Sequence, residues 1–273
     1  MLQAKILVAE AEENNWDDDR FVPRWRRWDA CSLCEQDYYG VVRCALGWAC
    51  WKTYLGRPEA NEIRRCAMNL LGNGLTGAEQ HEAALTVKEA ELSMQRRLGD
   101  SEDNILAVQS NLATSYQRLG RHEEAMCVRK DVYSGHLKLN GKGHESTLLA
   151  ANNYASSLAA MQRYAEAKWL LRRTLPAARR AHGDSHETTL RMRGYYAEAL
   201  YKDDGATLDD LREAMTTLED TERTARRVFG GAHPITKALR NARAALRARE
   251  EAAPDDVSSV CEEMAAMTPP GDS

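Results

Sequence analysis

Apolar residues recur at the spacing of a helix face along most of the chain. In 147–158, which reads TLLAANNYASSL, leucine, alanine and tyrosine return every three or four residues. A short turn at 160–163 separates this helix from a second one over 164–182. Gly183 follows directly, where many helices end with a glycine in the left-handed αL conformation. We therefore predict a pair of antiparallel helices here, and no segment of the chain predicts a strand.

This pattern repeats every 42 residues. A Gly-x-x-His run starts at 141 and 183, and again at 230 after a five-residue insertion. A Glu-Ala pair recurs in phase with it, at 82, 124, 166 and 213. Because independent markers in phase seldom arise by chance, we interpret the chain as a repeat array. Arrays of this kind usually bind other molecules and rarely carry out chemistry.

The markers set the expected bounds of the helices. First helices are predicted at 60–74, 103–118, 145–160, 187–202 and 233–252, and second helices at 78–98, 122–140, 164–182 and 207–229. The insertion falls at 203–206, in a turn, where extra length costs little. The alanine of each Glu-Ala pair is small enough to let two antiparallel helices approach closely near their turn. These alanines are Ala83, Ala125, Ala167 and Ala214.

The repeat also defines the expected domain organisation. The array covers 57–252, with repeats at 57–98, 99–140, 141–182 and 183–229 and a terminal helix at 230–252. Residues 20–56 are rich in tryptophan and cysteine, and we interpret them as a divergent unit that caps the exposed end of the array. Of the six tryptophans, Trp16, Trp25, Trp28, Trp48 and Trp51 lie in the first 51 residues. The ends, 1–19 and 253–273, are predicted to be flexible.

The repeats resemble the tetratricopeptide family, in the 42-residue form found in kinesin light chains. The third repeat carries the resemblance, in His144, Thr147-Leu148, the run 152–155 and the run 163–167. The resemblance implies an all-α, right-handed α-solenoid of stacked antiparallel helix pairs. It also implies that the first helices line a concave groove that binds a peptide. In light chains an asparagine at the position of Asn152 helps to hold the peptide backbone, whereas Met68, Ser110 and Gly194 occupy the equivalent positions here.

Positions in phase on the first helices give the candidate groove. The residues predicted to contact a peptide are Arg65, Met68, Ser110, Thr114, Arg118, Asn152, Ser156, Arg191, Glu198 and Lys202. Four of them are cations, so we expect a protein or peptide partner that carries acidic residues.

The cysteines leave one alternative open. Cys31 and Cys34 have the spacing of metal ligands, and Cys44 and Cys50 could complete a four-thiolate zinc site. Cys44 and Cys50 lie in a segment that looks helical, where six residues rotate by about 240°, so the two thiols would not share a face. Buried cysteines that act as small apolar residues are the more common outcome. We therefore predict no metal and no cofactor, and keep zinc as an alternative.

Composition narrows the function further. The net charge of −4 gives no basic excess for nucleic acid, and no apolar run approaches the length of a membrane span. Seven cysteines, an odd number in a helical chain, do not suggest a secreted disulfide framework, so we expect a cytoplasmic protein. No metalloprotease run, phosphate loop or recognisable nucleophile setting indicates an enzyme. We predict an interaction scaffold, and the alternatives are a self-assembling structural subunit or a zinc module positioned by the repeats.

Overall fold

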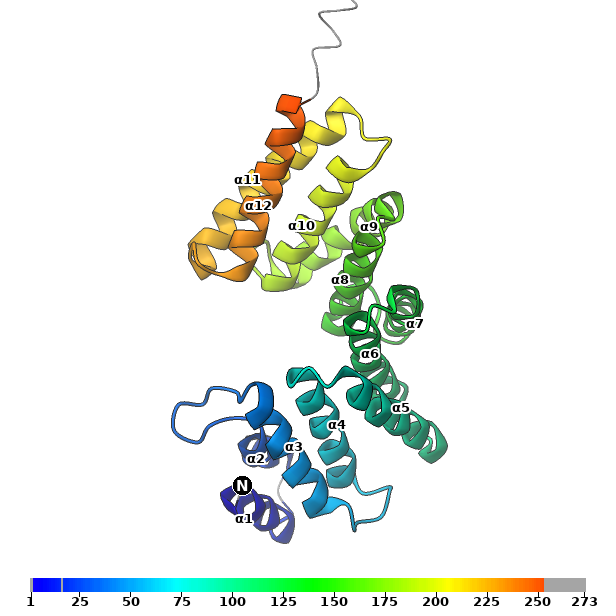
Figure 1. The fold of residues 1–273 in the computed structure, drawn as a ribbon, viewed down its shortest axis with the longest axis vertical. Helices are drawn as coiled ribbons and strands as arrows, with labels where there is room; N and C mark the ends of the chain where they lie inside the picture. The colour runs from blue at the N-terminus through cyan, green and yellow to red at the C-terminus, as the bar shows by residue number, and fades with distance from the viewer. Residues whose placement is uncertain (1, 16, 253–273) are drawn as a thin grey trace, which may run out of the picture. The chain divides into compact units, whose positions relative to one another are not determined.

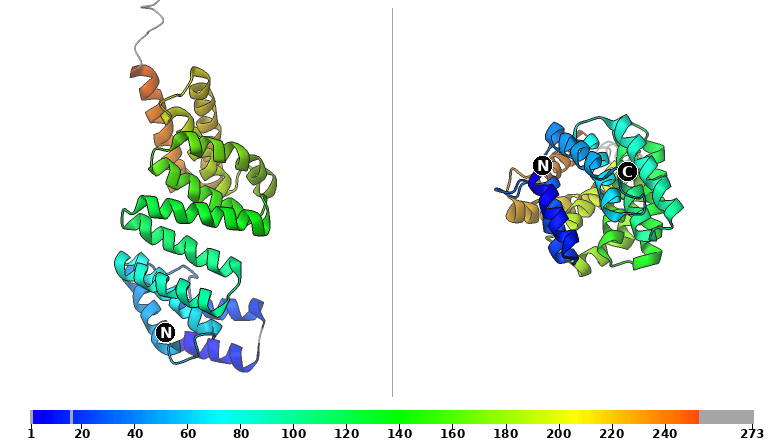
Figure 2. Two further views of the ribbon diagram at one scale, coloured as in Figure 1. Left: turned by 90° about the vertical axis from the view of Figure 1, so that its right-hand side faces the viewer. Right: turned by 90° about the horizontal axis from the view of Figure 1, so that it is seen from below.

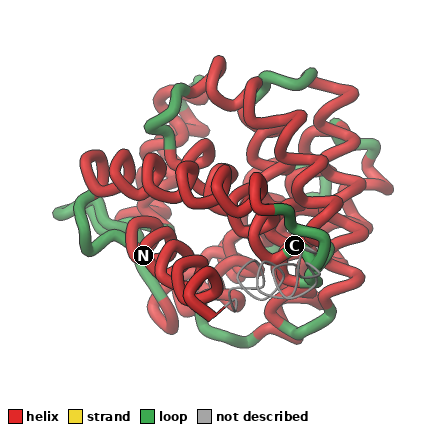
Figure 3. Tube along the Cα trace, turned by 90° about the horizontal axis from the view of Figure 1, so that it is seen from above, coloured by secondary structure: helices red, strands yellow, loops and turns green. Residues whose placement is uncertain are grey.

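The computed structural model describes residues 2–15 and 17–252, and these residues are almost entirely helical (Figure 3). No strand occurs among them, only one isolated bridge between Ala30 and Asp37. The helices are α1 (Leu2–Glu13), α2 (Asp18–Trp25), the 3₁₀ turn η1 (Arg26–Trp28), α3 (Gly40–Tyr54), α4 (Glu62–Gly77), α5 (His81–Leu98), α6 (Glu102–Arg118), α7 (His122–Asn140), α8 (Glu145–Ala160), α9 (Tyr164–His182), α10 (Glu187–Lys202), α11 (Leu208–Phe229) and α12 (Pro234–Ala252).

The prediction of an all-α fold of antiparallel helix pairs is confirmed. Neighbouring helices in the chain pack against each other, as α4 does with α5 and α6 with α7 (Figure 1). The predicted bounds of α7, α8, α9 and α10 coincide with those of the structure, and the other predicted helices of the array differ by at most three residues at either end. The 3.6-residue period therefore located these helices from sequence alone.

The chain divides into two compact units, Met1–Ser157 and Leu158–Ser273, which we call the N-terminal and C-terminal units. This division falls inside the predicted repeat 141–182. The proposed boundaries of the cap and of the individual repeats stay predictions. The tail predicted to be flexible, 253–273, and Trp16 lie outside the described residues.

Within 1–19, the segment predicted to be flexible, the structure contains a packed helix, α1. Ala4, Val8 and Ala11 recur on one face and are buried. Ala4 and Val8 belong to an apolar cluster with Trp28 of η1, so α1 lies against the following elements (Figure 2). Near the end of α1, Glu12 accepts two hydrogen bonds from Arg57, at 2.5 Å and 2.7 Å. The three-residue apolar face is too short to stand out in a segment that soon becomes acidic.

The predicted capping unit contains the densest aromatic packing of the N-terminal unit. Trp28 is fully buried and meets the Tyr54 ring edge-on, with 6.1 Å between the ring centroids. Trp25 packs on the same tyrosine at 6.0 Å. Trp48 stays exposed. The large rings of Trp25 and Trp28 therefore bury much of their apolar surface against α3.

Two glycines bring the backbones of α3 and α4 into contact. A methyl group placed on Gly47 would lie 3.0 Å from the Leu71 Cα, and one on Gly74 would lie 2.9 Å from the Arg43 carbonyl oxygen. Both of these neighbouring atoms belong to the backbone, so a change of side-chain rotamer could not relieve the clash. The two helices therefore pack at a distance that only glycine permits.

Each second helix of the array has a buried alanine near its start, but the first of these differs from the one expected. Ala125, Ala167 and Ala214 are buried as predicted. In α5, however, Ala83 is exposed and Ala84 is buried. The turn that follows α5, at 99–101, is one residue shorter than the equivalent turns at 141–144 and 183–186. The Glu-Ala marker at 82 is therefore one residue out of register with the helix that contains it.

The glycine after α9 also departs from the expectation. Gly183 has φ 83° and ψ 169°, which is a positive φ but not the αL conformation. Gly141 and Gly230 share this geometry, whereas Gly99, with φ 68° and ψ 37°, ends its helix in αL. This extended region at positive φ is open essentially to glycine alone, so the requirement for glycine is stricter than predicted.

Two buried cations cross-link helices inside the N-terminal unit. The Lys88 Nζ donates to Thr76 Oγ1 at 2.8 Å, to Ser115 Oγ at 3.0 Å and to the Asn111 carbonyl at 3.2 Å. One repeat later, Arg129 donates to Ser157 Oγ at 2.6 Å and to the carbonyl of Asn153 at 3.3 Å. Both cations stand four residues after the buried alanine. The residues at this position in the C-terminal unit are Leu171 and Leu218, which are fully buried.

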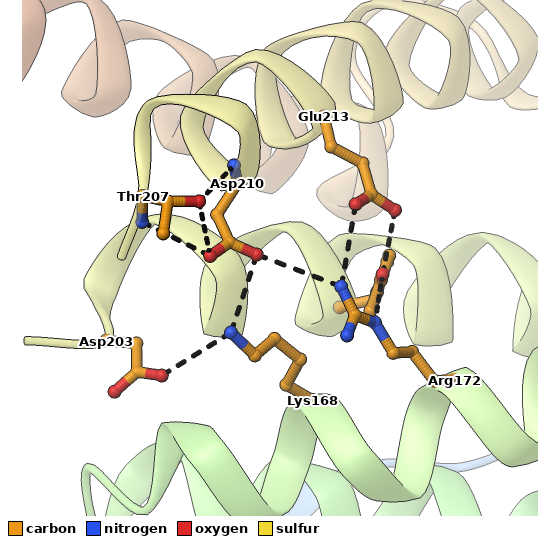
Figure 4. Close-up of polar contacts among 7 residues, drawn as sticks. Lys168, Arg172, Asp203, Thr207, Asp210 and Glu213 are labelled. Atoms are coloured by element: carbon orange, nitrogen blue, oxygen red, sulfur yellow. Dashed lines mark hydrogen bonds and ion pairs between the residues drawn. The ribbon is translucent and has the colours of Figure 1, made fainter. Parts of the chain in front are cut away.

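The five-residue insertion of the C-terminal unit is held by ion pairs to α9 (Figure 4). Lys168 lies 3.6 Å from Asp203 and 3.4 Å from Asp210. Asp210 also completes a capping box with Thr207, which starts α11. Arg172 donates to the Tyr196 hydroxyl at 2.9 Å, and that hydroxyl donates to Glu213 at 2.7 Å. The longer turn is therefore pinned by side chains of the preceding pair.

The glycine contact between α3 and α4 gives a stability prediction. We expect Gly74→Val to lower the free energy of unfolding by about 2 kcal/mol, because the new side chain would meet the backbone of α3. Chemical denaturation followed by circular dichroism measures the change. Gly56→Val is the control, since nothing lies within 4 Å of its added carbon. Equal stability of the two variants would show that α3 can move away without cost.

A second prediction concerns the start of α11. Asp210→Ala removes the N3 partner of the capping box and the carboxylate beside Lys168, so we expect a loss of about 1 kcal/mol at neutral pH. The hydrogen bond from the Thr207 backbone N–H lowers the pKa of Asp210. This stabilisation is therefore present above the ordinary aspartate pKa and is lost as the pH falls through the lowered value. Asp209→Ala, on a neighbour that is 92% exposed, should change the melting temperature little at any pH.

Candidate peptide-binding pockets

All ten residues predicted to form the groove lie on first helices. Arg65 and Met68 are on α4, and Ser110, Thr114 and Arg118 are on α6. Asn152 and Ser156 are on the part of α8 that belongs to the N-terminal unit. Arg191, Glu198 and Lys202 are on α10 of the C-terminal unit. In each unit a pocket between first helices includes some of these residues. Contact with a partner stays a prediction for all ten.

The C-terminal pocket lies between α10 and α12 and has a volume of about 250 Å³. Its walls are mostly apolar, and they are formed by Leu190, Arg191, Gly194, Tyr195, Glu198, Pro234, Ile235, Ala238, Leu239 and Ala242. Arg191 and Glu198 are two of the residues predicted to contact a peptide, and Gly194 occupies the position on the same face that is equivalent to Asn152. Gly194 keeps α12 close, since a methyl group there would lie 3.1 Å from the Leu239 Cδ2.

The N-terminal pocket lies between α4 and α6, with α5 beneath, and has a volume of about 190 Å³. It is mainly polar. Its lining residues are Glu62, Arg65, Cys66, Asn69, Glu91, Gln95, Asp100, Asn104, Ala107 and Val108. Arg65 was predicted for this face. The carboxylates around it were not.

Three of the four predicted cations already have a carboxylate partner in the same chain. Arg65 pairs with Asp100. Arg191 lies 2.8 Å from Glu187, and Lys202 lies 2.7 Å from Glu198. Sequence spacing suggests the two pairs within α10, which are four residues apart, but it does not suggest a pair 35 residues apart.

Arg118 and Asn152 differ most in their surroundings. Arg118 is exposed at the end of α6, and no ion pair to it is found in the part of the chain that the structure describes. Asn152 is buried, and its amide donates to the Asn153 Oδ1 at 3.3 Å. The Asn152 Oδ1 has no hydrogen-bond partner. Of the two, only Arg118 presents its side chain to solvent.

The buried polar residues of the N-terminal pocket are Glu91 and Gln95, and neither was predicted from the sequence as a site residue. Asn69 donates to Glu91 Oε1 at 3.3 Å. Burial raises the pKa of Glu91 to about 7, although the Asn69 bond and Lys88 act in the opposite direction. Burial also lowers the pKa of Lys88 to about 8. The sequence does contain a sign of them, because these two polar residues stand at positions on the buried face of α5.

The structure does not bring together the four cysteines of the zinc alternative. Cys50 is fully buried in the cluster around Trp28, whereas Cys44 packs with Leu71 and Leu75 in a separate cluster. No group of three or more histidine, cysteine, aspartate or glutamate side chains among the described residues could hold a metal ion. Backbone hydrogen bonds from Cys34 and Leu33 lower the pKa of Cys31 to about 7. The Cys31 thiol therefore ionises readily, but its loop is not joined by the further thiolates that a tetrahedral site needs.

Comparison with known proteins supports the repeat. Residues 147–187 match the model of a tetratricopeptide repeat family. No curated protein matches the chain significantly. The family match covers one helix pair and the start of the next, and it falls on the segment that carries the resemblance in sequence.

Solved structures support the fold. A putative kinesin light chain from Podosopora anserina, with nearly identical TPR-like repeats, is 19% identical, with a TM-score of 0.57 over 83% of this chain and 95% of that one. BtubC (BKLC) from P. vanneervenii is 14% identical, with a TM-score of 0.60 over 85% and 94%. A Rap protein complexed with Competence and Sporulation Factor is 14% identical, with a TM-score of 0.51 over 91% and 72%.

These comparisons confirm the tetratricopeptide-like fold of the kinesin-light-chain type. Such folds are typical of protein–protein interaction scaffolds and are generally not enzymes. None of the described helices is both long enough and apolar enough to cross a membrane.

Burial of Glu91 predicts an unusual pH dependence of stability. Its folded pKa, about 7, is above the value of 4.5 for a free glutamate. The neutral form therefore stabilises the folded state fully below pH 4.5, and this contribution is lost as the pH rises through 7. We expect Glu91→Gln to become more stable than the wild type by on the order of 2–3 kcal/mol between pH 5 and pH 8. Melting curves across this range measure the difference, and parallel curves for the two proteins would contradict it.

Proposed function

We propose that this chain is a non-enzymatic scaffold that binds a peptide segment of a protein partner on the faces formed by its first helices. The observation that carries the proposal is the apolar pocket between α10 and α12. Two of its lining residues, Arg191 and Glu198, were predicted to contact a peptide, and Gly194 lies on the same face.

The size of this pocket suits a side chain. Its volume of about 250 Å³ is below the range of about 300–1,000 Å³ that is usual for small-molecule sites. A large apolar side chain of a partner would bury its surface against Leu190, Ile235 and Leu239. Anchors of this kind supply most of the binding energy in protein interfaces.

The rim of the pocket would fix the orientation of the bound segment. Arg191 and Glu198 lie one above the other on α10, with Glu187 and Lys202 as their partners. Charges of both signs therefore flank the apolar walls. Exposed charges of this kind contribute more to orientation and specificity than to affinity.

The predicted preference for acidic partner residues stays a prediction, and it depends mainly on Arg118. An acidic side chain that approached Arg65, Arg191 or Lys202 would compete with the carboxylate already paired to each cation. The pairs of Arg191 and Lys202 are the more exposed ones. Exposed pairs are worth at most about 1 kcal/mol, so an exchange there gains little. Arg118 has no such competitor within the described residues.

The solved structures supply an analogy for this proposal. The Rap protein, which has a similar fold, is complexed with Competence and Sporulation Factor.

We further propose that the chain acts in the cytoplasm. The six described cysteines are free thiols, which is the usual state of cysteine in a reducing compartment.

A substitution that fills the pocket tests the proposal. Ala238 is exposed on α12 and lines the pocket, so Ala238→Arg should block it without disturbing the core. Ala244→Arg is the matched control on an exposed alanine of α12 that does not line the pocket. We expect at least one protein captured from a lysate by the wild type and by Ala244→Arg to fall about tenfold with Ala238→Arg, as measured by quantitative mass spectrometry. Identical capture by all three would contradict this docking site, provided that circular dichroism shows equal helicity.

A further inference from the structure

The N-terminal pocket combines an acidic lining with buried polar atoms that have no partner. Three carboxylates, those of Glu62, Glu91 and Asp100, line it against a single cation, Arg65. Burial raises the pKa of the Cys66 thiol to about 11, so the thiol adds no charge at neutral pH. The lining is therefore complementary to a positively charged group.

The unpartnered atoms point to the same kind of ligand. Glu91 is 1% exposed and Gln95 is 6% exposed, and neither Glu91 Oε2 nor Gln95 Oε1 has a hydrogen-bond partner. Gln95 Oε1 is an amide oxygen and therefore an acceptor, and Glu91 Oε2 is an acceptor when Glu91 is ionised. The Arg65 Nε, a donor in the same pocket, is also without a partner. Because a buried polar atom left unsatisfied is unfavourable, a ligand that supplies the missing bonds has a strong advantage.

The nearby cations do not satisfy these acceptors. The three hydrogen bonds of the Lys88 ammonium go to Thr76, Ser115 and the Asn111 carbonyl. The Arg65 guanidinium uses Nη1 for Asp100. Glu91 and Gln95 therefore remain open to a donor that enters through the mouth of the pocket.

The position of these two residues in the repeat makes them unusual. Glu91 and Gln95 stand seven and eleven residues after the buried alanine of their helix. The equivalents of Glu91 are Val132, Thr174 and Thr221, and those of Gln95 are His136, Ala178 and Ala225, all of which are buried. A carboxyl group and an amide thus replace smaller or less polar side chains at interior positions, where burial of a carboxylate is unfavourable.

We propose that the N-terminal pocket is a subsite for a basic side chain, an arginine or a lysine, of the bound partner segment. Its cationic head donates to Glu91 Oε2 and Gln95 Oε1, and a backbone carbonyl of the same segment accepts from Arg65 Nε. This inference rests on the proposed function, because it assigns a residue preference to a second pocket on the same kind of face. It also differs from the acidic preference that the sequence predicts.

The test uses small probes on the full chain. N-acetylarginine amide and N-acetylcitrulline amide have nearly the same shape, but only the first is charged. With ¹⁵N-labelled protein at pH 8, we expect the arginine probe at millimolar concentrations to shift the side-chain amide signals of Gln95 and Asn69. The citrulline probe should leave them unchanged. The same response to both probes, or to neither, would overturn the proposal.

Variants tie the response to the pocket. Glu91→Gln keeps the shape of the side chain and should weaken binding of the arginine probe at least tenfold. Gln95→Leu, which removes the second acceptor, should weaken it as well. Glu82→Gln makes the same change of charge on an exposed carboxylate of α5 and should have no effect. Unchanged binding by Glu91→Gln would overturn the subsite even if the probe binds elsewhere.

The Ala238→Arg variant separates this proposal from the proposed function. It alters only the C-terminal pocket, so it should bind the arginine probe as the wild type does. Loss of partners in Ala238→Arg without any difference between the arginine and citrulline probes would overturn the basic subsite alone. Selective binding of arginine with unchanged partners in Ala238→Arg would support the subsite and overturn the docking role of the C-terminal pocket.

Discussion

The close approach of neighbouring helices is the constraint on which the rest of this structure depends. In each second helix of the array one alanine is at most 1% exposed, and these are Ala84, Ala125, Ala167 and Ala214. Between α3 and α4 the same role falls to Gly47 and Gly74, where the backbones themselves meet. Because the residues at the contacts are small, the helices share a dense interior, and the first helices leave shallow pockets between them.

The two units share the repeat but fill their interiors differently. Four residues after the buried alanine, the N-terminal unit has Lys88 and Arg129, each bonded to a carbonyl and a hydroxyl of the next helix, whereas the C-terminal unit has leucines. A buried cation needs polar partners, so polar residues gather around it. This difference continues to the surface, where the N-terminal pocket is polar and acidic and the C-terminal pocket is apolar. One repeat pattern thus supports two pockets of different chemistry.

The differences between prediction and structure arise where a pattern along the chain does not show how the helices pack. The Glu-Ala marker at 82 predicted the wrong buried alanine, because the turn after α5 is one residue shorter than the equivalent turns. The buried alanine is therefore Ala84, although the helix period is unchanged. The helix α1 escaped notice because its face of Ala4, Val8 and Ala11 becomes meaningful only when Trp28 covers it. The spacing of the four cysteines left zinc open as an alternative, and only the packing of the helices shows that Cys44 and Cys50 belong to different clusters.

The helices of the array and their order could be predicted from the amino-acid sequence, because they follow from a local period of 3.6 residues repeated at a nearly constant step. Which charges are available to a partner depends instead on how the helices pack. Asp100 neutralises Arg65 across 35 residues of chain, and the packing of α4, α5 and α6 buries Glu91 and Gln95 without partners for Oε2 and Oε1. Such pairings depend on distances between helices, and the order of residues along one helix contains no information about them.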